Sequence, residues 1–268
     1  MNNVLKYPGS KWSTSDWIIS NFPLDYEKMT YLEPYLGSGA VFFNKNRSKI
    51  ETINDLDGSI VNLFKVIRDN PDELTRAVEY TPWSRQEYQN SYELTNNDIE
   101  NARRFLVRCW QAIGTKTSDI TGWSNNIKPT DNGKSRWSRL EPAIRQAALR
   151  LKSENLNMVQ IENKKAIDLI KIYNRPYVFI YCDPPYILST RSKRIYKCEM
   201  TDDEHVELLT VLKEHHGPVM ISGYMNDIYK EMLKDWIVKT RKSNCEKGKS
   251  ATEVIWMNYD AGQMKMEV

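Results

Sequence analysis

The sequence predicts an α/β fold with a mostly parallel sheet that is interrupted by an inserted helical lobe. Short apolar stretches alternate with helical spacing up to about residue 69, and the alternation resumes near residue 156. A polar stretch containing tryptophan and asparagine separates the two parts. Alternating strands and helices are typical of a parallel sheet. We therefore expect residues 1–69 and 156–268 to form one α/β domain and residues 70–155 to form the insertion.

Two strand-and-helix units are expected before the insertion. After a turn-rich loop at 6–12, apolar residues at 17–22 have the spacing of a short amphipathic helix. A strand then ends at 31–34 and leads into a glycine turn and an apolar helix at 36–43. A second strand at 51–55 ends in an acidic residue, and helical spacing follows it.

The α/β pattern returns after the insertion. The stretch at 177–182 is continuously apolar, as buried central strands are. The other expected elements are strands at 158–161, 219–222 and 252–259 and helices at 202–215 and 227–233. Open parallel sheets bind ligands at the carboxyl ends of their strands, so the residues that follow the strands form the candidate site.

Length, cysteine content and hydropathy limit the class of protein. The 268 residues suffice for one sizeable domain with an insertion. No apolar run approaches the ~20 residues needed to cross a bilayer, and the first residues lack the charged-then-apolar order of a leader. The four cysteines form no CxxC pair, and there are three histidines, so we expect no metal site. We expect a cytoplasmic, monomeric protein with reduced thiols.

Glycines and acidic residues follow the first two strands. Gly37 and Gly39 allow a tight turn and a close approach of a small molecule to the backbone. In nucleotide-binding sheets an acidic residue about 20 positions further on holds a ribose. Asp55 fits this position, and Asp57 is the alternative. Together these residues favour an adenosine-containing ligand.

The most specific element is Asp183-Pro184-Pro185-Tyr186, at the end of the central strand. The two prolines remove two amide donors and leave the Asp183 side chain and the Pro184 carbonyl as acceptors. Acceptors suit an amino group, because drawing its hydrogens toward them frees the nitrogen lone pair. Tyr186 offers a surface for stacking a base that has left its duplex, and we expect its ring rather than its hydroxyl to act.

These motifs resemble the Dam-like family of DNA adenine methyltransferases, in the order of its alpha group and over nearly the whole chain. The resemblance implies an S-adenosylmethionine-dependent, Rossmann-like fold with seven strands that methylates N6 of adenine in double-stranded DNA. It implies that Asp183, Pro184 and Tyr186 are catalytic. It also implies that the cofactor is contacted by Tyr7, Lys11, Glu33, Pro34, Gly37, Ser38, Gly39, Asp55, Asn163 and Asp183.

The chain departs from the family pattern in places. Gly9-Ser10 stands where the family usually has two glycines, and the contact to the cofactor adenine falls at Glu162 or Asn163. The lobe does not match the family in a way that predicts a target sequence. The same chemistry on the amino group of cytosine or on RNA adenine is an alternative function, and a DNA-binding module without cofactor is another.

The insertion is the expected DNA-recognition lobe, because its charge is locally high. The net charge of the chain is +3, but the segment from Arg103 to Lys152 contains eleven basic and three acidic residues, a surplus of +8. Its long glycine-containing loop lacks an apolar period, which suits a segment that orders against a groove. The candidate DNA contacts are Lys116, Lys128, Lys134, Arg136 and Arg139, of which the last two are the strongest.

Overall fold

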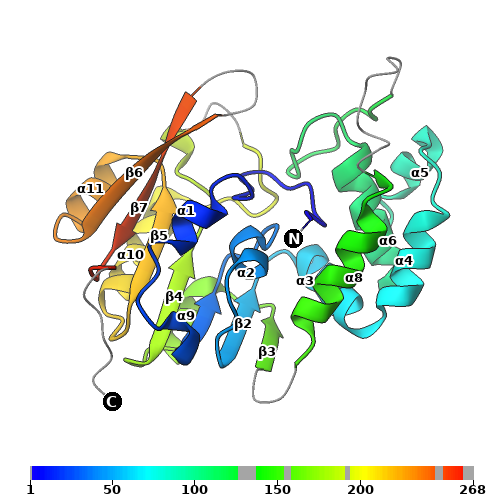
Figure 1. Ribbon diagram of the computed structural model, residues 1–268. Coiled ribbons are helices and arrows are strands. Elements are labelled where there is room, and N and C mark those ends of the chain that lie inside the picture. The colour runs from blue at the N-terminus through cyan, green and yellow to red at the C-terminus, as the bar shows by residue number, and fades with distance from the viewer. Residues whose placement is uncertain (1, 126–136, 154–157, 191–193, 245–249, 262–268) are drawn as a thin grey trace.

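The computed structural model (Figure 1) describes residues 2–125, 137–153, 158–190, 194–244 and 250–261. A seven-stranded sheet runs through it in the order β3-β2-β1-β4-β5-β7-β6. The strands are β1 (Thr30–Glu33), β2 (Ile50–Asn54), β3 (Met158–Glu162), β4 (Val178–Cys182), β5 (Val219–Gly223), β6 (Ile237–Asn244) and β7 (Ser250–Met257). The first five pair in parallel, and β7 runs antiparallel to both β5 and β6. The expected mostly parallel seven-stranded α/β sheet is confirmed.

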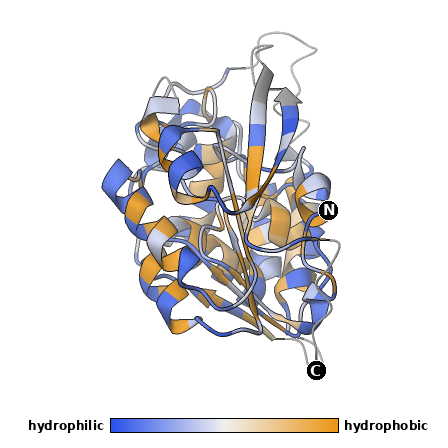
Figure 2. Cartoon of the chain, turned by 90° about the vertical axis from the view of Figure 1, so that its left-hand side faces the viewer, coloured by the Kyte–Doolittle hydropathy of each residue, from blue (hydrophilic) through white to orange (hydrophobic). Residues whose placement is uncertain are grey.

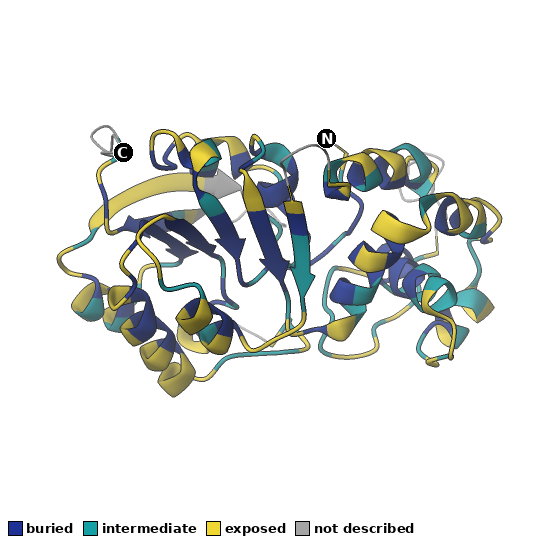
Figure 3. Ribbon diagram, turned by 90° about the horizontal axis from the view of Figure 1, so that it is seen from below, coloured by how far each residue is buried: buried dark blue, intermediate teal, exposed yellow. Residues whose placement is uncertain are grey.

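Helices cover both faces of the sheet, as the view from below shows (Figure 3). One face carries α1 (Ser15–Ile19), α2 (Ala40–Asn44) and α3 (Gly58–Asp69), and the other carries α9 (Ala166–Ile172), α10 (Asp202–Lys213) and α11 (Asp227–Met232). Side chains alternate along a strand, so β4 sends Phe179 and Tyr181 into the first layer and Ile180 into the second.

The central strand is apolar along its whole length because both of its faces are covered. Every residue of β4 is buried. Coloured by hydropathy, the helices around the sheet mix hydrophobic and hydrophilic positions (Figure 2). A strand buried on two sides gains from apolar side chains at every position, which explains the continuous run in the sequence.

The insertion forms helices that lie beside α3 at one end of the sheet (Figure 1). They are α4 (Pro71–Glu79), α5 (Arg85–Asn90), α6 (Asp98–Gln111) and α8 (Leu140–Leu151). Phe105 of α6 and Ile144 of α8 belong to the same apolar cluster as α3 and Phe179 of the sheet. The Trp110 indole donates to the Val4 carbonyl at 2.9 Å. The lobe therefore packs firmly on the α/β domain, and its boundaries at 70 and 155 stay a prediction.

Strand β6 was not expected from the sequence. It lies at the edge of the sheet, and its residues 237–242 are all exposed. Its sequence is rich in lysine and arginine there, which is typical of edge strands that avoid pairing with other chains. Because neither face is well covered, the apolar alternation that identifies a strand is missing.

Two observations on membrane spans and metal sites apply to the described residues. None of the helices described is long and apolar enough to cross a membrane. In the part of the chain that the structure describes, no group of three or more histidine, cysteine, aspartate and glutamate residues could hold a metal ion.

The strand order reverses between β1 and β4. From β1 the sheet continues through β2 to β3, and from β4 it continues to β5, so connections leave the two neighbouring strands in opposite directions. At such a switch point the loops after the strands separate and leave a crevice at the carboxyl edge.

Candidate active site

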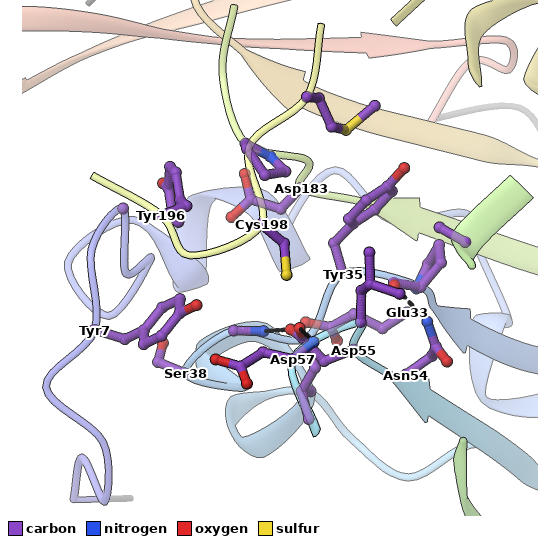
Figure 4. Close-up of a pocket in the computed structure, with 18 of the residues that line it drawn as sticks. Tyr7, Glu33, Tyr35, Ser38, Asn54, Asp55, Asp57, Asp183, Tyr196 and Cys198 are labelled. Atoms are coloured by element: carbon purple, nitrogen blue, oxygen red, sulfur yellow. Dashed lines mark hydrogen bonds between the residues drawn. The ribbon is translucent and has the colours of Figure 1, made fainter. Parts of the chain in front are cut away.

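A cavity of about 290 Å³ lies at this crevice (Figure 4). Its walls come from the amino-terminal loop, the loops that follow β1 to β4, and the segment after the Asp183 motif. They include Tyr7 to Lys11, Glu33 to Ser38, Asn54 to Asp57, Lys165 to Asp168, Asp183, Pro185, Tyr196 and Cys198 to Met200. Segments distant in the sequence thus meet where the fold predicts a ligand.

The glycine loop after β1 is shaped by two left-handed residues. Gly37 has φ +50° and Gly39 has φ +67°, conformations that side chains rarely adopt. A Cβ on Gly39 would lie 2.7 Å from the Phe43 ring, so Gly39 allows α2 to begin there. Gly37 and Ser38 line the cavity, whereas Gly39 is not among the lining residues. Gly39 therefore shapes the loop from behind.

The amino-terminal loop packs against the glycine loop. Tyr7 lines the cavity, and the Ser10 hydroxyl hydrogen-bonds the Ser38 hydroxyl at 2.8 Å. Gly9 has φ +66° and lies so close to Tyr196 that any Cβ would meet its hydroxyl. Only the first of the family's two glycines is sterically required here, and Ser10 uses its side chain to join the two loops.

Asp55 and Asp57 have different surroundings. The Asp55 carboxylate accepts from the Gly37 amide at 2.8 Å and from the Asp57 amide at 2.9 Å, and burial raises its pKa to about 6. Asp57 caps α3 through the Ser59 amide and pairs with Lys197 at 2.9 Å. Asp57 is only 3% exposed and serves the helix and the ion pair, whereas Asp55 is half-buried, so Asp55 is the better placed acceptor for a ligand hydroxyl.

Glu33 is a buried acid on the cavity wall. Its side chain accepts from the Tyr31 hydroxyl at 2.6 Å, and the residue is 2% exposed. Burial raises the pKa of Glu33 to about 8, although the hydrogen bond from Tyr31 opposes this shift. A cationic ligand in the cavity would favour the ionised form of this acid.

Lys11 points toward the Asp183-Pro184-Pro185-Tyr186 motif. Its ammonium lies 3.0 Å from Asp183 Oδ1, donates to the Gly9 carbonyl at 3.0 Å, and sits 4.6 Å from the centre of the Tyr186 ring. It also lies 4.0 Å from Glu253. Burial disfavours its charge, but Asp183 and Glu253 outweigh this and raise the pKa of Lys11. Lys11 lines the cavity, and its ammonium group interacts with the carboxylates of Asp183 and Glu253.

Asp183 is oriented through one of its two oxygens. Oδ1 accepts from the Ser222 hydroxyl at 2.7 Å as well as from Lys11. Ser222 belongs to β5 and is itself hydrogen-bonded to the Tyr181 hydroxyl at 3.2 Å. Oδ2 has no hydrogen-bond partner among the described residues. Asp183 thus presents a fixed, available acceptor at the cavity.

Tyr186 lies beyond Asp183 and is 7% exposed. Its hydroxyl donates to Glu253 Oε2 at 2.7 Å, and the Tyr224 ring lies 4.6 Å away at an angle of 72°. Lys11 occupies one face of the Tyr186 ring, so a stacked base would use the other face. Of the two prolines, Pro185 lines the cavity and Pro184 does not.

Among the residues after β3, some hold a neighbouring loop in place and others line the cavity. The Asn163 side-chain amide donates to the Asp55 carbonyl at 2.7 Å and to that of Leu56 at 3.3 Å, so it holds the loop after β2. Glu162 pairs with Lys164 at 3.4 Å, and neither Glu162 nor Asn163 lines the cavity. The wall is formed instead by the four residues from Lys165 to Asp168. Their position just after a carboxyl strand end could have indicated them.

Pro34, another expected cofactor contact, lines the cavity, and its carbonyl accepts from the Asn54 side chain at 2.9 Å. Asn54 also bonds both backbone groups of Lys164. It thereby ties together the loops that follow β1, β2 and β3. Tyr196 and Cys198, which the sequence did not suggest, close the cavity from the segment after the Asp183 motif.

The expected DNA contacts are placed only in part. Lys128, Lys134 and Arg136 lie outside the described residues. Arg139 is exposed, and Lys116 forms an ion pair with Asp119. Much of the positive surplus of the lobe is neutralised within the protein, because acidic partners bind Arg103, Arg104, Arg145 and Arg150.

Comparison with known proteins identifies the family. The D12 class of N6 adenine-specific DNA methyltransferases matches residues 7–246. A type II methyltransferase of Lactococcus lactis subsp. cremoris is 24% identical, over 85% of this chain and 86% of that protein. A type II methyltransferase of Methanocaldococcus jannaschii is 23% identical, over 95% of this chain and 98% of that protein. The DNA adenine methylase of Escherichia coli (strain K12) is 22% identical over 93% and 91%. With a family match across nearly its whole length, the chain belongs to the D12 class N6 adenine-specific DNA methyltransferases.

Proposed function

We propose that the cavity binds S-adenosylmethionine and that Asp183, the Pro184 carbonyl and Tyr186 hold an adenine extruded from double-stranded DNA for direct in-line methyl transfer. The observation that carries this proposal is the orientation of Asp183. Two donors fix Oδ1 and leave Oδ2 available at the edge of the cavity.

The cavity walls fit this methyl donor. Asp55 offers carboxylate oxygens to ribose hydroxyls, and Gly37 lets the backbone approach the ligand closely. Glu33 is an acid that can balance a positive charge inside the cavity. Lys165 to Asp168 follow β3 and form the wall where the adenine ring of the donor would lie. Asn163 would support this binding indirectly, through the backbone of Asp55.

The catalytic motif fits an amino group as the acceptor of the methyl group. The donor supplies an electrophilic methyl group on a sulfonium sulfur. Asp183 Oδ2 and the Pro184 carbonyl accept the two hydrogens of the adenine amino group, which draws the nitrogen toward a tetrahedral geometry with an exposed lone pair. The nitrogen becomes acidic after it gains the methyl group, so Asp183 takes up the lost proton and passes it to water.

Tyr186 supports the extruded base. A duplex adenine must leave its stack to reach a methyl donor held in a cavity. Lys11 lies over one face of the Tyr186 ring, so the base would stack on the opposite face. Stacking of this kind contributes roughly 1 to 3 kcal/mol per base.

Product analysis tests this proposal directly. The purified chain would be incubated with labelled S-adenosylmethionine and duplex DNA, single-stranded DNA or RNA, and the products digested to nucleosides. We expect N6-methyladenine from the duplex. Labelled N4-methylcytosine, or label in RNA alone, would overturn the proposal.

Calorimetry tests the cofactor site. Asp55→Asn should weaken S-adenosylmethionine binding by about tenfold, the loss expected when charged hydrogen bonds are weakened. Asp57→Asn is the matched control, because asparagine also caps helices well and should leave affinity nearly unchanged. The reverse result would assign the ribose contact to Asp57, and equal wild-type affinity in both variants would remove it from this loop.

A further inference from the structure

We propose that Glu253 of β7 is a positioning residue for methyl transfer, which fixes the Tyr186 ring in the orientation that stacks the target base. The inference rests on the proposed function, because it assigns a supporting residue to the same site. Glu253 lies 67 positions after Tyr186 in the sequence, outside every motif that the sequence indicated.

The contact between the two residues is close and protected. The Tyr186 hydroxyl donates to Glu253 Oε2 at 2.7 Å, and the Glu253 side chain is 12% exposed. The Tyr186 residue is 7% exposed. Hydrogen bonds to a charged acceptor are stronger than neutral ones, and removal from water limits competition for the hydroxyl. The end of the ring is therefore anchored.

The sheet places Glu253 at this edge. β7 pairs antiparallel with β5, and Val254 lies opposite Gly223. Its neighbour Glu253 is thereby brought to the carboxyl end of β5, where Ser222 holds Asp183. The two carboxylates of the site are thus positioned by adjacent strands.

Lys11 gives the ring a second restraint. Its ammonium lies over the face of Tyr186 and is 4.0 Å from Glu253 and 3.0 Å from Asp183. With the hydroxyl held by Glu253 and one face covered by Lys11, the ring has little freedom to rotate. A ring that is already fixed loses little entropy when the base stacks on it.

The kinetic experiment compares four variants under single-turnover conditions. Glu253→Ala and Tyr186→Phe should each slow methyl transfer about tenfold, because each removes one charge-assisted hydrogen bond. The sequence suggested that only the Tyr186 ring acts; under this proposal the hydroxyl also contributes, by orienting that ring. Glu253→Gln keeps an acceptor for the hydroxyl and should stay within about threefold of wild type. The double variant Tyr186→Phe, Glu253→Ala should be no slower than either single variant, since both remove the same interaction. Asp235→Asn, at an exposed position between α11 and β6, is the control.

A spectroscopic measurement separates ring position from general damage. A duplex with 2-aminopurine at the target adenine becomes fluorescent when the base leaves the stack, and stacking on Tyr186 quenches part of this signal. We expect Glu253→Ala and Tyr186→Phe to bind the duplex with wild-type affinity but to give a brighter complex. Glu253→Gln and Asp235→Asn should match the wild type.

Several results would overturn the inference. One is a Glu253→Gln variant as slow as Glu253→Ala, which would assign the effect to charge. Another is fully multiplicative losses in the double variant. Wild-type rates in Glu253→Ala and Tyr186→Phe, together with an inactive Asp183→Ala, would remove the role of Glu253 and leave the proposed function intact. An active Asp183→Ala would instead refute the proposed function.

Discussion

Replacement of Asp183 by asparagine should be as damaging as replacement by alanine. Ser222 and Lys11 both donate to Oδ1, so the carboxamide oxygen must take that position in the variant. Its NH2 group then occupies the position of Oδ2. There it presents hydrogens to an adenine amino group that needs an acceptor. An isosteric change thus turns a favourable contact into an unfavourable one.

The expected loss follows from the role of a preorganised polar group in the transition state. Removing one such group commonly lowers the rate by about 10² to 10³, or roughly 3 to 4 kcal/mol. Single-turnover transfer from labelled S-adenosylmethionine measures the rate, and filter binding measures DNA affinity, which should stay near wild type. Thermal melting checks the fold, because Lys11 keeps a partner in asparagine but loses one in alanine. Asp183→Asn with a rate within tenfold of wild type would refute this reasoning.

Three further predictions concern the cofactor, the fold and the DNA. The pKa of Glu33 near 8 lies above its ordinary 4.5, so the stability of the fold should decrease as pH rises from about 4.5 to 8. The affinity for S-adenosylmethionine should increase toward pH 8, because the ionised acid attracts the cationic donor. Glu33→Gln should remove the pH dependence of stability, measured by thermal melting, and that of affinity, measured by calorimetry. Glu51→Gln should lower the free energy of unfolding, measured in urea, by about 3 to 5 kcal/mol, because it leaves a buried cation without its partner. Asp72→Asn, which breaks an exposed ion pair, is the control and should change it little. Arg139→Ala should weaken binding to all duplexes and lower the salt slope by about one, unlike Arg145→Ala; unchanged binding and slope would remove Arg139 from the interface.

The parallel part of the fold could be predicted because burial on both faces leaves a continuous apolar signal. β4 shows this, with every residue buried. The exposed edge strand β6 gives no such signal, and only its pairing with β7 identifies it. Hydrophobic periodicity in a sequence reflects which faces of a segment are buried, so a strand exposed on both faces has no periodic pattern that identifies it.

The site divides along similar lines. Asp55 and Asp183 could be found because each directly follows a strand, and Gly37 because it lies in the loop after β1; topology requires the ligand to lie at these strand ends. Ser222 and Glu253 act through tertiary contacts, and their partners depend on how strands pair. The ion pair of Lys11 with Asp183 likewise depends on tertiary contacts, so the sequence did not indicate it.

Local charge was a weaker guide than local hydropathy. The surplus of the lobe suggested a basic surface, yet Arg150 of α8 binds Glu51 of β2 at 2.6 and 2.8 Å. Glu51 also binds Lys45 at 2.5 Å in a buried cluster, and these cations lower its pKa against the effect of burial. Arg150 thus joins the lobe to the sheet, although a sum of charges over the sequence counts it as free.

The net charge of the groups around Tyr186 suits the proposed reaction. Lys11, Asp183 and Glu253 together carry one net negative charge beside the end of the cavity where we propose that the base binds. Methyl transfer moves a positive charge from sulfur toward the adenine nitrogen, so a negative surplus on the nitrogen side favours the transition state over the ground state. Without Lys11 the two carboxylates would lie in a largely buried site with no cation between them, where like charges repel more strongly than in water. The buried lysine therefore stabilises the pair of carboxylates, and the second carboxylate keeps the net charge of the group negative.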